Sequence, residues 1–194
     1  MRKSEIVVDC MMYRGESKEE VSMHIRMYHC GFGDCFNLID KYNNSLYVDF
    51  GIHNYSMDKA TREAIYDRIV NLMQGKDDFL LTHYHDDHYA GAIYMAKMKR
   101  QFRNVYIPDI WNINESVQVV SLLLLRGLIT KSVLKNGLSI IQFLQEICCS
   151  KGRIYFVKRN TKIQQSYIAL WPDEKYIEKR AKNIYQNLCI FENR

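Results

Sequence analysis

A short apolar run leads directly into a cluster of histidines and aspartates in the stretch Leu80-Leu81-Thr82-His83-Tyr84-His85-Asp86-Asp87-His88-Tyr89-Ala90-Gly91. Three of the six histidines and two aspartates of the chain fall within positions 83–88. Neutral imidazole and carboxylate groups are ligands that zinc, iron and manganese accept. His83 and His85 are two residues apart, so on an extended backbone both rings leave the same face. Asp87 and His88 follow where the chain must turn. The stretch therefore predicts a metal site, since such a spacing is rare in an ordinary polar loop.

The segment 83–88 resembles the His-x-His-x-Asp-His signature of the metallo-β-lactamase superfamily. Two segments upstream follow in the order of that family. Gly31-Phe32-Gly33-Asp34 is similar to the Gly-x-Gly-Asp turn of the branch that includes the hydrolase domain of the DNA-uptake competence channel protein. Tyr47-Val48-Asp49-Phe50-Gly51 is similar to the strand that ends in Asp-x-Gly before the metal loop. The resemblance implies an α/β fold, the metallo-β-lactamase-like αββα sandwich, of which this chain would carry mainly the N-terminal half.

The resemblance also implies roles for the residues of the metal loop. His83 and His85 would hold one metal, Asp87 and His88 would hold the other, and Asp87 would be a catalytic residue. The implied cofactor is zinc, as two ions in a complete site, with iron or manganese as alternatives. Such a site would serve a metal-dependent hydrolase that uses a metal-bound hydroxide.

Two aspartates upstream of the loop are candidates for supporting it. Asp49 is an acid inside an apolar strand, where a carboxylate is costly unless it finds a partner. We expect Asp49 to orient the histidine loop, because metal-bound imidazoles usually donate their second N–H to an acceptor. By resemblance, Asp34 would lie beside the metal pocket; the alternative is that it only caps the glycine turn by accepting backbone N–H bonds.

No histidine follows His88, although the family's dinuclear site also uses a bridging aspartate and a late histidine from the second half of its domain. We therefore expect residues 1–194 to form a single metallo-β-lactamase-like domain that is incomplete at its C-terminal end. The surface left without a second sheet would then be covered by a homodimer or by another partner. A catalytically incomplete half-domain that acts as a binding module is an alternative to the enzyme.

The charge of the chain bears on its substrate. The net charge of +5 permits an anionic substrate, and with the motif it favours a phosphodiester or nucleic acid. A thioester, lactone or lactam hydrolase on the same fold is an alternative, because a fold does not settle the substrate. The basic cluster Lys158, Arg159 and Lys162 could meet a phosphate backbone, but a solvated turn is the favoured interpretation.

Cysteines and hydropathy bear on the location of the protein. None of the six cysteines forms a Cys-x-x-Cys pair, and no secretory signal opens the chain, so free thiols in a cytoplasmic protein are expected. The apolar segment 117–134 contains Arg126, Gly127 and Lys131, which argues against a membrane span.

Hydrophobic periodicity predicts the elements of an α/β layer. Strands are expected at 6–12, 21–28, 35–39, 45–50, 79–82, 105–108, 154–157 and 167–171, and helices at 57–74, 87–100 and 173–187. Residues 114–150 read as a helical insertion within the domain. His29 falls on the apolar phase after the second strand, so we expect it in the core or behind the metal site.

Overall fold

The computed structural model describes residues 5–13, 20–54, 56–83, 85–109, 144, 146–179 and 182–183. The chain divides into two compact units, residues 1–107 with 143–155 and residues 108–142 with 156–194. The structure is mixed α/β, as the sequence predicts. The helical insertion predicted at 114–150 lies mostly outside the described residues. The single domain predicted over residues 1–194 stays a prediction, as does the αββα sandwich.

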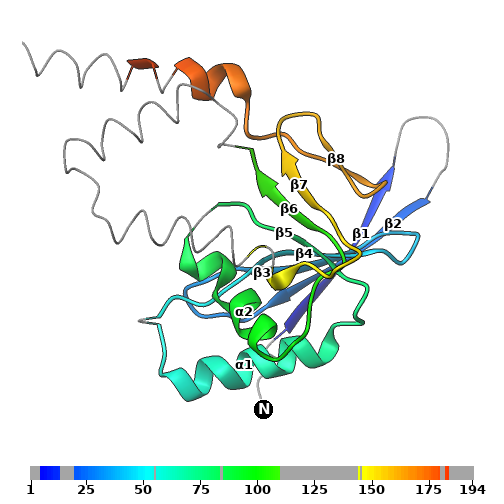
Figure 1. The fold of residues 1–194 in the computed structure, drawn as a ribbon. Helices are drawn as coiled ribbons and strands as arrows, with labels where there is room; N and C mark the ends of the chain where they lie inside the picture. Colours follow the sequence, from blue (N-terminus) through cyan, green and yellow to red (C-terminus); the bar gives the residue numbers. More distant parts are fainter. Residues whose placement is uncertain are drawn as a thin grey trace, which may run out of the picture. The chain divides into compact units, whose positions relative to one another are not determined.

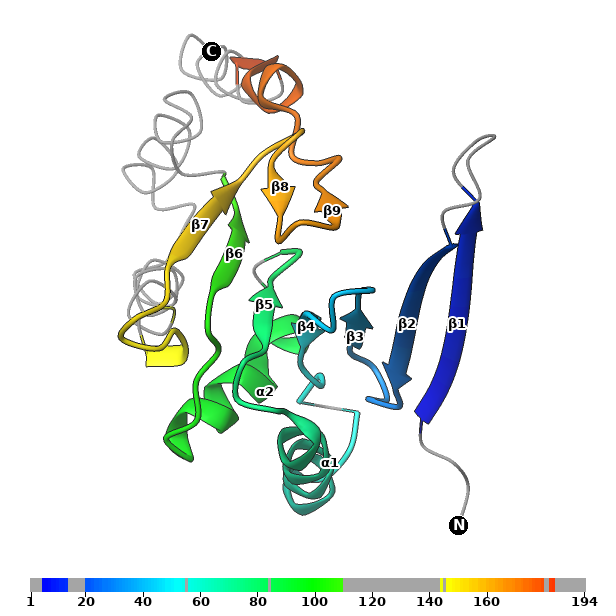
Figure 2. The same ribbon diagram turned by 90° about the vertical axis from the view of Figure 1, so that its right-hand side faces the viewer.

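The main sheet has the strand order β1-β2-β3-β4-β5-β6-β7 (Figures 1 and 2). Its strands are β1 Glu5–Tyr13, β2 Glu20–Tyr28, β3 Cys35–Ile39, β4 Ser45–Phe50, β5 Asp78–Leu80, β6 Val105–Pro108 and β7 Ile154–Val157. The strands β1 to β4 pair antiparallel, whereas β4 with β5 and β5 with β6 pair parallel. Parallel neighbours need a crossover, and the helices α1 (Lys59–Leu72) and α2 (Asp86–Lys97) provide it.

The two helices cover one face of the strands that carry the predicted motifs (Figure 1). The helix α1 begins after Asp58, whose carboxylate accepts hydrogen bonds from the Thr61 N–H at 3.0 Å and the Thr61 hydroxyl at 2.6 Å. These bonds hold the pKa of Asp58 below its usual value. Between helices and sheet lies an aromatic and aliphatic core, whose fully buried members include Tyr47, Phe50, Ile69, Phe79, Met95 and Phe102.

An ion pair between the buried Asp78 and the partly exposed Arg103 joins the starts of β5 and β6. The Arg103 guanidinium donates to both carboxylate oxygens of Asp78 at 2.9 Å, and Asp78 is fully buried. The Asn104 N–H donates to the same carboxylate at 3.1 Å. A forked, charge-assisted pair of this kind fixes geometry as well as energy. The beginnings of the parallel strands are thus held together, and their carboxyl ends are left to carry the histidine loop.

Several predicted boundaries differ from the structure. The helix expected at 57–74 is shorter because Asp58 caps it and Met73 is already extended. The strand expected at 79–82 ends at Leu80. His29 is exposed, so its predicted place in the core is wrong, and a place behind the metal site stays a prediction. The reason is that this end of β2 buries the phase of Tyr28 and Cys30, whereas Met27, which shares the phase of His29, is itself 39% exposed.

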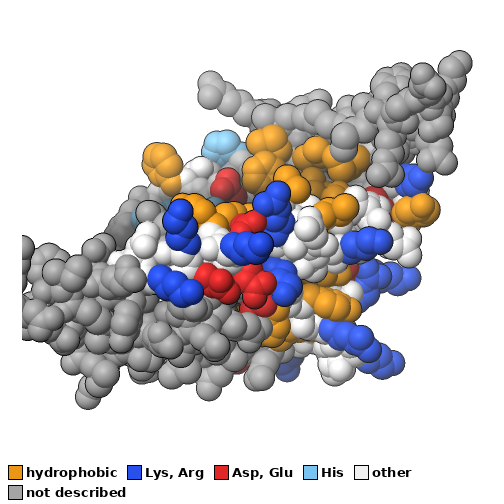
Figure 3. All heavy atoms as spheres, turned by 90° about the horizontal axis from the view of Figure 1, so that it is seen from above, with side chains coloured by type: hydrophobic (Ala, Val, Ile, Leu, Met, Phe, Trp, Pro, Cys, Tyr) orange, Lys and Arg blue, Asp and Glu red, His pale blue; other side chains and the backbone are white. Residues whose placement is uncertain are grey.

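The second unit contains a small antiparallel sheet formed by β8 (Lys162–Ile163) and β9 (Tyr167–Ile168). The sequence predicted only β9, over 167–171, and placed Lys162 in the preceding turn. Lys158 pairs with Glu174 at 3.5 Å and Arg159 with Asp173 at 2.8 Å. On the described part of the face in Figure 3, Lys and Arg side chains are likewise interspersed with Asp, Glu and hydrophobic side chains. These pairings fit the solvated turn better than a phosphate-binding surface.

Two expectations on composition can be compared with the described residues. Cys30, Cys35 and Cys148 are buried and Cys149 is half-buried, all as free thiols. No described helix is long and apolar enough to cross a membrane.

Candidate metal centre

The histidine loop connects the carboxyl end of β5 to the start of α2. Leu81 is fully buried and anchors the chain just before the loop. His85 is the N-cap residue of α2, and Asp86 and Asp87 occupy its first turn, where acidic side chains complement the helix dipole. The Asp86 carboxylate accepts the Asp87 N–H at 3.1 Å, within the first turn of the helix. The chain therefore turns from the loop into the helix at Asp87 and His88, the last two predicted metal ligands.

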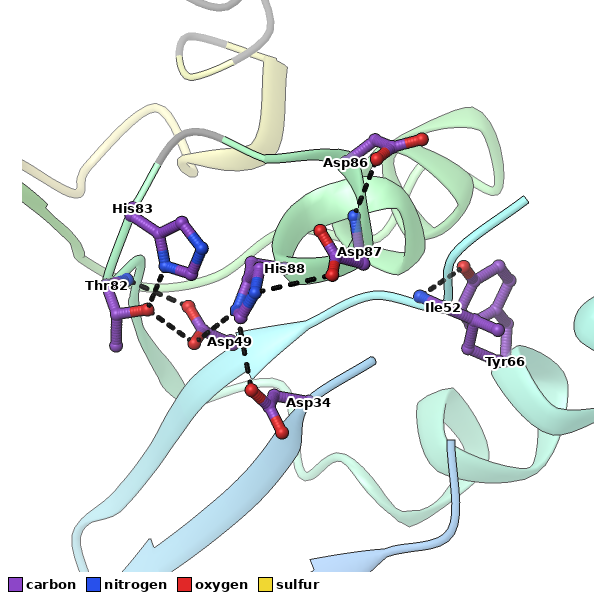
Figure 4. Close-up of polar contacts among 9 residues, drawn as sticks. All are labelled: Asp34, Asp49, Ile52, Tyr66, Thr82, His83, Asp86, Asp87 and His88. Carbon is purple, nitrogen blue, oxygen red and sulfur yellow. Dashed lines mark hydrogen bonds and ion pairs between the residues drawn. The ribbon is translucent and has the colours of Figure 1, made fainter. Parts of the chain in front are cut away.

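Asp49 lies at the centre of the hydrogen bonds of this loop (Figure 4). Its side chain is 4% exposed, and its backbone has φ of +56°, a conformation that few residues other than glycine, asparagine and aspartate adopt. The carboxylate accepts the Thr82 N–H at 2.8 Å and the Thr82 hydroxyl at 2.6 Å. It also accepts a hydrogen bond from His88 Nδ1 at 2.8 Å. Asp49 thus holds the histidine loop by hydrogen bonds, and its role behind a metal ligand stays a prediction.

His88 is buried between carboxylates on both sides of its ring. Its side chain is 9% exposed, Nδ1 faces Asp49, and Nε2 lies 3.6 Å from the Asp87 carboxylate. Asp34 Oδ2 lies 3.7 Å from Nδ1, and the Asp34 side chain is 50% exposed. With Nδ1 bonded to Asp49, the nitrogen that remains for another ligand is Nε2, beside Asp87.

The ring of His83 lies between the rings of the other two histidines of the loop, in contact with each. The ring centroids of His83 and His88 are 3.7 Å apart, and those of His83 and His85 are 4.8 Å apart. Although His83 is exposed as a residue, partial desolvation of its ring lowers its pKa, and the neighbouring His88 and His85 lower it further. A low pKa keeps an imidazole neutral, which is the form that binds a metal.

Two glycines bring the three predicted motifs to backbone contact. A Cβ on Gly51 would lie 2.4 Å from the carbonyl carbon and oxygen of Asp87 and 2.6 Å from the His88 nitrogen. A Cβ on Gly33 would lie 2.3 Å from the Gly51 oxygen. The Asp34 N–H donates to the Asp87 oxygen at 3.3 Å, and the Gly51 N–H donates to the Asp34 oxygen at 3.2 Å. The glycine turn therefore lies beside the histidine loop, as its resemblance implied.

The structure brings together some predicted site residues more closely than others. Asp34, Asp49 and His88 each offer one ligand atom, and these atoms lie within 4.8 Å of one another. His83 and His85 are joined to this group through ring contacts. The group fits a metal such as zinc by the chemistry of its donors, which are imidazole nitrogens and carboxylate oxygens. Whether Asp87 has a catalytic role stays a prediction.

Sequence reasoning assigned no role to two further residues. The Thr82 hydroxyl lies 3.0 Å from His83 Nδ1 as well as 2.6 Å from Asp49. The Tyr66 hydroxyl of α1 accepts the Ile52 N–H at 3.1 Å and so holds the segment that follows Gly51. A hydroxyl directly before the first histidine is a signal that could have identified Thr82. Nothing in the local sequence points from Tyr66 to residue 52, because 14 positions separate them.

The lowered pKa of His83 predicts a pH dependence of the metal-free protein. Because the pKa is lower in the folded than in the unfolded chain, the unfolded chain binds more protons below about pH 6.5. The unfolding free energy should therefore fall as the pH drops below that value, and less steeply in His83→Gln. Urea unfolding with a chelator, from about pH 7.5 to about pH 5, measures both slopes. Equal slopes in the two proteins would contradict the prediction.

The chain was also compared with known proteins. No protein-family model, no curated protein and no solved structure matches it.

Proposed function

We propose that this chain forms a zinc-dependent hydrolase site at the carboxyl ends of β4 and β5. The observation that carries the proposal is the setting of His88. Its Nδ1 is hydrogen-bonded to the buried Asp49 carboxylate at 2.8 Å, and its Nε2 lies 3.6 Å from the Asp87 carboxylate. An imidazole fixed from behind by a carboxylate, with its second nitrogen beside another carboxylate, is the arrangement of a metal-binding histidine.

We infer that the metal lies on the Nε2 side of His88, with Asp87 as the neighbouring ligand. The alternative is the group of Asp34, Asp49 and the Nδ1 of His88. Against it, the Asp49 carboxylate already accepts three hydrogen bonds, two of them from Thr82. Moving Asp49 onto a metal would disturb the two hydrogen bonds by which Thr82 holds this carboxylate, and hydrogen bonds to a charged group are worth about 1.5–3 kcal/mol each. His83 and His85 supply the imidazoles of the second predicted position.

The residues of the chain have separate tasks in this proposal. When bound, zinc would supply a Lewis acid and lower the pKa of a water molecule. Asp87, whose side chain is 28% exposed, reaches both the metal position and the solvent. Asp49 keeps the His88 ring oriented from behind. Asp34, half-exposed beside the Nδ1 of His88, lies where it can accept a proton or position a substrate group.

The substrate class that we propose is a phosphodiester. It is supported by the net charge of +5 and by the resemblance of Gly31-Phe32-Gly33-Asp34 to the competence-type turn. The acidic partners of Lys158 and Arg159 argue against a dedicated phosphate surface at that turn, so recognition of the phosphoryl group would fall to the metal centre itself. A thioester or lactone substrate is the competing proposal on the same site.

Zinc titration of the chelator-treated protein by calorimetry tests the metal site. We expect the wild type to bind zinc. In Asp87→Asn and His88→Gln the zinc affinity should fall by more than the roughly 10–100-fold that is typical when a residue only orients a ligand. His24→Gln, which changes an exposed histidine of β2, is the matched control and should bind zinc as the wild type does. A wild type that binds no zinc would refute the proposal. A larger loss in Asp34→Asn than in Asp87→Asn would place the metal in the alternative group.

Hydrolysis assays on the zinc-loaded protein then test the substrate class. We expect turnover of bis-p-nitrophenyl phosphate or single-stranded DNA, and its loss in Asp87→Asn. Turnover of a thioester alone would favour the competing substrate. Zinc binding without hydrolysis of any of these would instead favour a binding module.

A further inference from the structure

We infer that Thr82 is a positioning residue through which Asp49 sets the tautomer of His83 in addition to that of His88. Thr82 lies between the two groups, with its hydroxyl 2.6 Å from Asp49 Oδ2 and 3.0 Å from His83 Nδ1 (Figure 4). Its backbone N–H donates to the other oxygen, Asp49 Oδ1, at 2.8 Å. The inference deepens the proposed function by assigning which nitrogen each of the two histidines offers.

The hydroxyl of Thr82 can serve both neighbours in only one way. It carries a single hydrogen, and an ionised carboxylate can only accept. The hydrogen therefore goes to Asp49, and the hydroxyl oxygen is left to accept from His83. A neutral imidazole has one N–H, so His83 must carry it on Nδ1. Its Nε2 is then unprotonated and available as a ligand.

His88 reaches the same state by a direct contact. Its Nδ1 donates to Asp49 Oδ2 at 2.8 Å, so its Nε2 is also unprotonated. The same oxygen, Asp49 Oδ2, therefore receives the Thr82 hydroxyl and the His88 ring. The buried Asp49 carboxylate therefore sets the tautomer of one histidine at each predicted metal position. It contacts His88 directly and reaches His83 through Thr82.

Two-bond ¹H–¹⁵N correlation spectra of the metal-free protein test this inference without any metal. At about pH 8, where histidines are neutral, we expect His83 and His88 of the wild type to be protonated at Nδ1. Thr82→Val keeps the shape and the backbone N–H of Thr82 but removes the hydroxyl. In this variant His83 should shift toward the Nε2–H tautomer, whereas His88 keeps Nδ1–H. Thr82→Ser should restore the wild-type pattern.

Zinc titration of the same proteins gives a second measurement. We expect Thr82→Val to bind zinc about 10–100-fold more weakly, as is typical when the partner of a ligating histidine is removed, and Thr82→Ser to stay close to the wild type. Asp86→Asn is the matched control, because this carboxylate accepts from Asn54 and from the Asp87 N–H, outside the Asp49 network. It should leave both histidine tautomers unchanged.

The outcomes separate this inference from the proposed function. An Nε2–H tautomer of His83 in the wild type, or an unchanged His83 signal in Thr82→Val, would overturn the role of Thr82 even if zinc binds. The expected tautomers in a wild type that binds no zinc would support the role of Thr82 and refute the metal site. If Thr82→Val does not fold, the spectra of the wild type and of Thr82→Ser still decide the tautomer of His83.

Discussion

Asp49→Ala is expected to be one of the two most damaging single substitutions at this site. It removes the acceptor of two Thr82 donors and of His88 Nδ1, and Asp49 is only 3% exposed. The His88 donor is buried, and leaving it without a partner costs about 1–3 kcal/mol, whereas the exposed Thr82 can turn its donors to water. We therefore expect the unfolding free energy of the metal-free protein to fall by about 2 kcal/mol. Because both histidines lose their orientation, zinc affinity should fall by about 10–100-fold or more.

Urea unfolding and zinc titration of three proteins measure these effects. Asp49→Asn keeps the size of the side chain and one acceptor oxygen, so its loss of stability should be smaller than that of Asp49→Ala. Asp86→Asn changes a carboxylate of the same loop outside this network and should leave both quantities near the wild-type values. If Asp49→Ala were as stable as Asp86→Asn, the central place given to Asp49 would be wrong.

Gly51→Ala should disrupt the site through a steric clash with the backbone of the histidine loop. The added Cβ would lie 2.4 Å from the carbonyl carbon and oxygen of Asp87 and 2.6 Å from the His88 nitrogen. All three are backbone atoms at the start of α2, which cannot rotate away as the end of a side chain can. Since overpacking of a rigid contact typically costs about 1–3 kcal/mol, we expect a loss of stability near the upper end of that range. The displaced loop should also bind zinc far more weakly than the wild type.

Gly75→Ala is the matched control for this substitution. Gly75 has φ of +76°, and a Cβ there would meet nothing within 4 Å. Alanine at Gly75 should therefore cost only the roughly 1–2 kcal/mol of a left-handed backbone and should leave zinc affinity unchanged. A Gly51→Ala protein with unchanged zinc affinity would show that the loop can move without consequence for the metal, contrary to the proposal.

The sequence predicted the order and type of the elements around the site well, because their signals are local. Alternating apolar residues marked β2, and β3, β4, β6 and β7 have the predicted bounds. The short β8 was missed because two residues give no periodicity. His29 was misplaced because the apolar phase of β2 was taken as its buried face, whereas at this end of the strand Met27 is exposed and Tyr28 is buried. The αββα sandwich stays a prediction, since nothing in the described residues tests it.

The sequence predicted which residues would form the candidate site, but not the contacts between them. The histidine loop and the supporting place of Asp49 followed from residue types and from the cost of an acid in an apolar strand. The nitrogen that each histidine offers could not be predicted, because it depends on contacts between residues far apart in sequence, such as Asp49 and His88, 39 positions apart. The position of Thr82 directly before the first histidine could have pointed to it, but its contact with Asp49, 33 positions away, could not be predicted.

The backbone contacts at Gly33 and Gly51 determine which substitutions near this site can be tolerated. The spacing between the turn, the end of β4 and the histidine loop is set by main-chain atoms, which every residue possesses. The side chain of Phe32, in the glycine turn, is 78% exposed and takes no part in these main-chain contacts. We therefore expect substitutions at Phe32 to leave the spacing of the histidines and aspartates unchanged.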